Sequence, residues 1–228
     1  AAAGVERVKR AVSELSVAGV RERSEIARLA LAASEDGLQE NEELLRRAVT
    51  AANAGLGESA QAFERVVGIL KAFREEVTPE SFTRVANSLV AVGNAVGVNR
   101  EKLADAVREA SNLAAQYGVS LETVEVLIAK VANRTGDFGG ATRAVSNLIR
   151  RLGDESDDLH KSLALIGVDL GPEALGGTRI LSTLATIGEL IEKDARLRNT
   201  LIQGDRNAAS LLDLVTTKQR DLRAALEA

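Results

Sequence analysis

Apolar side chains recur every three or four positions along most of this chain of 228 residues, which is the spacing of amphipathic helices. The segment from 79 to 96 shows the pattern most clearly, because Phe82 and Leu89 fall on one apolar face. Its start is also marked, since Thr78 offers a capping hydroxyl and Pro79 suits the first helical position. The periodicity predicts helices over the ranges 5–18, 20–35, 39–53, 58–75, 79–96, 99–117, 120–133, 140–152, 155–166, 178–192, 194–202 and 205–226.

Glycine-containing joints separate several of these helices. In Gly118-Val119-Ser120, the glycine can end one helix in the left-handed conformation, the valine can pack the corner, and the serine can cap the next helix. Gly97-Val98-Asn99 has the same order of residue types. The glycine pairs at 139–140 and 176–177 lack the strand and the Gly-Lys-Ser/Thr ending of a nucleotide loop, so we expect turns there. The predicted structural joints are Gly97, Val98, Asn99, Gly118, Val119, Ser120, Gly139, Gly140 and Gly167, with similar joints at Gly37, Gly55 and Gly57.

These elements predict an all-α fold, a compact array of short amphipathic helices joined by tight glycine-containing turns. Apolar residues make up 45% of the chain and aromatic residues only 2%, so we expect an aliphatic core between packed helices. The stretch GVDLGPEALGGT, 167 to 178, leaves room for a short extended pair, and Pro172 within it marks a further helix start. The predicted organisation is a helical approach segment over 1–36, a helical core domain over 37–215 and an exiting helix over 216–228.

The charge pattern narrows the choice of function. The net charge is -4, and basic side chains are interspersed with acidic ones, so bulk binding of phosphate is disfavoured. The chain has no cysteine, which excludes disulfides, thiolate metal sites and cysteine nucleophiles. It has no methionine either, and we expect it to be an excerpt of a longer protein. The longest uncharged run, between Arg84 and Arg100, is too short to span a bilayer.

Candidate catalytic and metal-binding residues are few. His160 is the only histidine and lies beside the acidic stretch DESDDL. A metal site is one interpretation, but acids at a helix start, favoured by the helix dipole, explain the pattern more simply. The pairs Glu58-Ser59 and Glu155-Ser156 match the Glu-Ser pair of helical lytic transglycosylases, but neither precedes the Gly-Leu-Met-Gln type motif of those enzymes. We therefore expect no catalytic residue, no metal site, no cofactor and no enzyme.

Two longer stretches resemble the core region of phage tail tape-measure proteins. The first, GVNREKLADAVREASNLAAQYGVSLETVEVLIAKVANR, contains both Gly-Val-polar joints. The second, GDFGGATRAVSNLIRRLGDESDDLHKSLALIGVDL, looks like the glycine-rich turn of that family, its Ala-Thr-Arg-Ala helix and its terminal Leu-Gly-Val. The resemblance runs from about Leu44 to Leu170. It departs from the family at TGDFGGAT, where the family has a longer glycine-rich link, and it includes no apolar membrane-inserting segment.

This resemblance implies a structural role in the virion. Tape-measure proteins lie extended in the lumen of the tail tube and set tail length during assembly in the host cytoplasm, helped by tail assembly chaperones. They leave ahead of the DNA at genome ejection. The implied form is a homo-oligomer around the tail axis, near the tip, with tail-tip or baseplate hub and tail-tube proteins as partners.

The resemblance implies no specific nucleic-acid binding, and it implies membrane contact only through parts outside this fragment. A helical adaptor or scaffold that binds protein partners in grooves between its helices is the alternative. A lytic transglycosylase-like tail enzyme is the weaker third interpretation.

Overall fold

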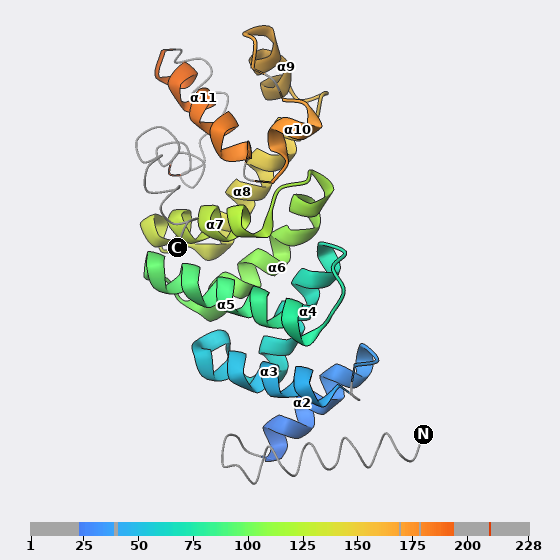
Figure 1. The fold of residues 1–228 in the computed structure, drawn as a ribbon. Helices are drawn as coiled ribbons and strands as arrows, with labels where there is room; N and C mark the ends of the chain where they lie inside the picture. The colour runs from blue at the N-terminus through green and yellow to red at the C-terminus, as the bar shows by residue number, and fades with distance from the viewer. Residues whose placement is uncertain (1–22, 39–40, 169, 178, 194–209, 211–228) are drawn as a thin grey trace. The chain divides into compact units, whose positions relative to one another are not determined.

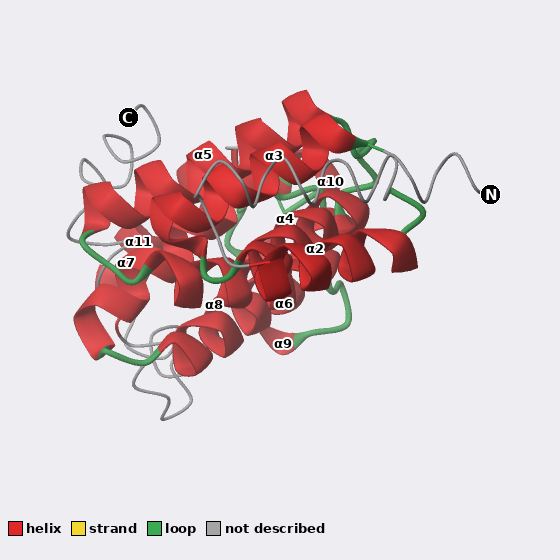
Figure 2. Ribbon diagram, turned by 90° about the horizontal axis from the view of Figure 1, so that it is seen from below, coloured by secondary structure: helices red, strands yellow, loops and turns green. Residues whose placement is uncertain are grey.

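The fold is all-α, as the hydrophobic pattern predicts. The computed structural model describes residues 23–38, 41–168, 170–177, 179–193 and 210. Figure 2 shows helices joined by loops, with no strand among these residues. The helices predicted over 5–18, 194–202 and 205–226, residues 1–22 of the approach segment and the exiting helix over 216–228 lie outside the described residues, except for the single residue 210.

The chain divides into two compact units, residues 1–90 and 91–228. The boundary falls inside α5 (Pro79–Val96), within the range 37–215 that the sequence assigns to one core domain. The predicted domain boundaries stay predictions. Each unit buries its own set of aliphatic side chains.

In the first unit, α4 (Ser59–Ala72) packs against α2 (Arg23–Glu35), α3 (Glu42–Ala51) and the π-helical turn η1 (Ala52–Leu56). The core is aliphatic except for one aromatic pair. Phe63 from α4 stacks on Phe82 from α5 with ring centroids 6.2 Å apart, a distance typical of favourable aromatic pairs. The largest fully buried side chains of this unit include Ile26, Leu29, Leu44, Leu45, Leu56, Phe63, Ile69, Leu70, Phe82 and Leu89.

The second unit is built around α7. Its helices are the end of α5, α6 (Arg100–Gln116), α7 (Leu121–Thr135), α8 (Phe138–Gly153), α9 (Asp158–Leu165), α10 (Pro172–Leu175) and α11 (Arg179–Lys193). As Figure 1 shows, α6, α7 and α8 lie together; each packs against the other two, α9 and α10 contact α8, and α11 packs on α10. Residues 123–129 of α7 are all fully buried, including Glu125. A helix that is covered on every side belongs to the interior of a fold.

The helix bounds agree closely with the periodicity, and α5 covers 79–96 as predicted. Two features differ. The turn η1 continues α3 beyond the predicted end at 53, and Gly55 within it has a φ of 93°. The extended pair expected near 167–178 is a single isolated bridge between Gly177 and Val119, so this segment pairs with a distant joint and not with itself.

Candidate functional site

The joint Gly118-Val119-Ser120 forms the turn that the sequence predicts. Gly118 is left-handed, with a φ of 70°, and its N–H donates to the carbonyl oxygen three residues earlier at 3.2 Å. The N–H of Val119 donates to the carbonyl oxygen five residues earlier at 2.9 Å. This pair of bonds is the Schellman ending of a helix. The side chain of Ser120 then accepts from the N–H of Thr123 at 3.3 Å and caps α7.

Two further predicted joints have related geometry. Gly97 and Gly167 are left-handed, with φ of 77° and 85°. The N–H groups of Val98 and Val168 each donate to the carbonyl oxygen five residues earlier, at 2.9 and 3.1 Å. The side chain of Asn99 accepts from the backbone N–H three residues later at 2.8 Å, which caps α6. At these joints, one glycine and one apolar residue end a helix as expected.

The turn between α7 and α8 differs from the prediction. Gly139 and Gly140 lie in the first turn of α8 and do not connect the two helices. Gly136 makes the turn, with a φ of 71° at the C-terminal end of α7. Asp137 starts α8, because its Oδ1 accepts from the N–H of Gly140 at 2.8 Å. An aspartate N-cap offsets the weak helix propensity of the two glycines.

The joint at Gly118 also binds a distant segment. The N–H of Gly177 donates to the carbonyl oxygen of Gly118 at 2.7 Å, and the N–H of Ser120 donates to the carbonyl oxygen of Gly177 at 3.4 Å. The hydroxyl of Thr123 donates to the same carbonyl oxygen at 3.5 Å. Residues just after α10 are therefore attached to the connection between α6 and α7, which sequence reasoning missed.

The pair Glu58-Ser59 has a structural role at the start of α4. Ser59 is buried, and its N–H and hydroxyl both donate to Oε1 of Glu25, at 2.8 and 2.7 Å. Glu58 is exposed and forms an ion pair with Arg28 at 2.9 Å. Glu58 and Ser59 thus dock α2 on the N-terminus of α4, where negative charge is favoured.

The acidic turn between α8 and α9 is held by its own hydrogen bonds. The hydroxyl and N–H of Ser156 donate to Oδ1 of Asp154 at 2.6 and 2.9 Å, and these bonds lower the pKa of that carboxyl from its ordinary value. Nδ1 of His160 lies 2.6 Å from the carbonyl oxygen of Leu152 at the end of α8. Among the described residues, no three histidine, aspartate or glutamate side chains gather as metal ligands would.

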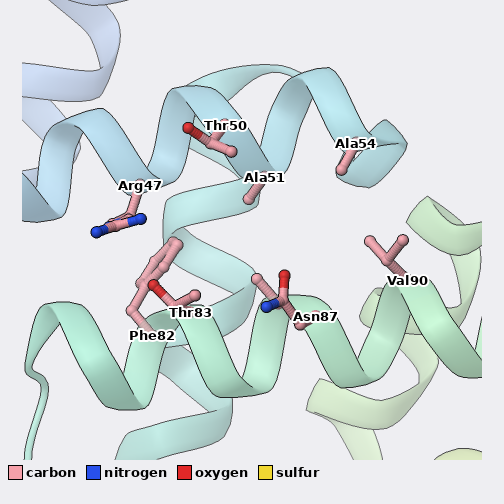
Figure 3. A pocket seen from close by; sticks show the side chains of 9 residues that line it. Arg47, Thr50, Ala51, Ala54, Phe82, Thr83, Asn87 and Val90 are labelled. Carbon is pink, nitrogen blue, oxygen red and sulfur yellow. The ribbon is translucent and has the colours of Figure 1, made fainter.

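A shallow groove lies between α3 and α5 in the first unit (Figure 3). Its empty space is about 320 Å³, part of which is open solvent. Small apolar side chains mix with polar ones along it, and Figure 3 shows the two rows facing each other across the gap. The lining residues are Arg47, Thr50, Ala51, Ala54, Phe82, Thr83, Ala86, Asn87 and Val90.

The described helices show no membrane-spanning character, since none of them is both long enough and apolar enough to cross a bilayer.

Comparison with known proteins gives one family. Residues 9–223 match the family model described as phage-related minor tail protein. The match therefore includes α2 to α11 and both stretches that resemble tape-measure proteins. Neither curated proteins nor solved structures gave a match.

Proposed function

Because the chain belongs to the phage-related minor tail protein family, and so has a structural role in the phage tail, we propose that it is the core part of a tape-measure protein. In this role it sets tail length during assembly and is released at genome ejection. The family match over residues 9–223 is the observation that carries the proposal.

The order of the joints supports the finer assignment. The stretches that resemble tape-measure proteins, 97–134 and 136–170, correspond to α6 with α7 and to α8 with α9. The joints at Gly97, Gly118 and Gly167 have the left-handed glycines that this resemblance requires. Each joint is closed by a few backbone hydrogen bonds, so a chain of such short helices can be extended one joint at a time.

The proposed setting is the lumen or tip of the virion tail, after assembly in the host cytoplasm. The proposed partners are tail-tube proteins, the tail-tip or baseplate hub, and tail assembly chaperones, with several copies of the chain around the tail axis. Specific nucleic-acid binding is not part of the proposal, because the net charge of -4 works against a grip on DNA.

Release at ejection gives the test. The amount of this chain relative to a tail-tube protein can be measured by quantitative mass spectrometry in intact virions and in virions that have ejected their DNA. The proposal predicts a clear signal in intact virions and a loss of about tenfold or more after ejection. Equal amounts before and after ejection would contradict release.

A helical adaptor of the tail is the second candidate, favoured by the groove between α3 and α5. An adaptor would remain in the tail after ejection. Filling the groove by Ala86→Trp would then release its partner from the tail, whereas the exposed change Glu64→Ala on α4 would not.

A further inference from the structure

The exposed face of α8 carries two arginines and no acid. We define the cationic face of α8 as Gly139, Arg143, Ser146, Asn147 and Arg150, which follow one another along one side of the helix. Arg143, Asn147 and Arg150 are exposed. Within the described part of the chain, the guanidinium of neither Arg143 nor Arg150 forms an ion pair or hydrogen bond. Their charges are therefore available to a partner.

The spacing of the two arginines is regular. They stand seven residues apart, which is two helical turns and roughly 10.5 Å along the axis. Nη1 of Arg143 lies 3.5 Å from where a side chain on Gly139 would begin. The glycine thus leaves room for this guanidinium to lie along the helix. The opposite face of α8 is buried against α6 and α7, so the cationic face is held on a rigid support.

Other cations of the molecule have acids beside them. On α6, the exposed Arg108 is next to Glu109 and three residues after Asp105, so that face carries both signs. Five cations of the first unit pair with acids, in Arg28–Glu58, Arg46–Glu42, Arg47–Glu43, Lys71–Asp36 and Arg84–Glu75. The cationic face of α8 differs because its uncharged positions separate arginines from one another and not from carboxylates.

We propose that the cationic face of α8 docks an acidic helix of a partner protein, with carboxylates seven residues apart that meet Arg143 and Arg150. Arginine and carboxylate groups form paired hydrogen bonds of defined geometry. Such a partner helix also offers two carboxylates with the same axial spacing as the arginines. The proposal goes beyond the tail role and does not depend on it, because it rests on the chemistry of this face alone.

Charge favours an acidic protein over nucleic acid. Two guanidiniums neutralise only two phosphates, and affinity for DNA grows with the number of phosphates that are neutralised. The net charge of the chain is -4, which repels a polyanion as a whole. Two well-placed carboxylates on a short helix present much less negative charge to the rest of the surface.

The test uses the whole chain and three labelled probes in fluorescence anisotropy at low salt. One probe is an alanine-based helical peptide with glutamates seven residues apart, the second has the same glutamates spread around the helix, and the third is a short DNA duplex. We expect the first peptide to bind most tightly and to lose affinity as salt is raised. The double variant Arg143→Glu/Arg150→Glu should weaken this binding about tenfold or more.

Two variants make the outcome specific. Arg108→Glu is the matched control, since it reverses one exposed arginine on α6 and should leave peptide binding within about twofold. Arg143→Gln/Arg150→Gln removes the charges without reversing them and should also weaken binding, with circular dichroism confirming the fold of every variant. The proposal is overturned if the peptide does not bind, if DNA binds as tightly, or if the control loses as much affinity as the double variants.

Discussion

At the scale of single residues, the closest approach in the second unit is between Tyr117 and Gly153. A Cβ atom added at 153 would lie 2.2 Å from Cδ1 of the tyrosine ring, well inside van der Waals contact. Gly153→Ala forces the ring or the end of α8 to move. We expect it to destabilise the chain by about 1–3 kcal/mol, measured by urea unfolding.

Gly139→Ala provides the control for this prediction. Gly139 also lies in α8, but the nearest atom to an added Cβ is Nη1 of Arg143 at 3.5 Å, an ordinary contact. Alanine favours the helix over glycine by roughly 1 kcal/mol, so this variant should be neutral or more stable. If Gly153→Ala behaves like Gly139→Ala, the tyrosine contact is not a constraint.

Arg74 is the one non-glycine residue with a positive φ, 57°, among those described. It stands after α4 where other helices have glycine, and its N–H donates to the carbonyl oxygen of Lys71 at 3.0 Å. A left-handed L-residue costs roughly 1–2 kcal/mol, so Arg74→Gly should raise the free energy of unfolding by about 0.5–1 kcal/mol. Arg74→Ala, which keeps the backbone cost, should not. Equal stability of the glycine and alanine variants would argue against this explanation.

At the scale of elements, α2 is attached to α4 through Glu25. Its carboxylate accepts both the N–H and the hydroxyl of Ser59, and both side chains are buried. Glu25→Ala leaves buried donors unsatisfied and should cost about 1–3 kcal/mol of stability. Glu64→Ala, at an exposed position of α4, should change the unfolding midpoint little. Similar small effects for both variants would show that this attachment does not stabilise the unit.

The turn between α8 and α9 gives a prediction on pH. Hydrogen bonds from Ser156 lower the pKa of Asp154, so the folded chain favours the ionised carboxyl. This contribution to stability is present above the pKa of the unfolded aspartate and is lost as pH falls through the lowered folded value. Ser156→Ala should raise the pKa of Asp154 toward its ordinary value, measured by carboxyl carbon NMR. An unchanged titration would contradict the assigned cause.

The elements that the sequence predicted well are those with local causes. The α5 helix has a proline start and a regular apolar face, and its bounds were predicted correctly. The joints at Gly97 and Gly118 were predicted because a left-handed glycine and a following cap act within a few residues. The turn before α8 was assigned to Gly139-Gly140, since the competing N-cap at Asp137 was not recognised.

Long-range contacts could not be predicted in the same way. Gly177 pairs with Val119, but no neighbouring residue of either one indicates the other. The same holds for Tyr117 against Gly153 and for Glu25 against Ser59. These contacts arise from the packing of whole helices, so periodicity predicts each helix but not which ends meet.

At the scale of the whole molecule, two all-α units built from short helices belong to a family of phage tail proteins. The described residues combine glycine joints, aliphatic cores and surface ion pairs. The proposed tape-measure role makes a demand on the length of the chain, because an extended helical ruler adds roughly 1.5 Å per residue. Tail length should therefore follow the length of this protein.

That relation is the most direct test of the account. A helical segment of about 60 residues inserted in frame after the exposed Gly136 should lengthen the tail by roughly 90 Å, at 1.5 Å per residue. Tail lengths are measured by electron microscopy of virions in which the longer protein has been verified. A longer tail in proportion to the insert is the predicted result, and an unchanged tail length in such virions would contradict the tape-measure assignment.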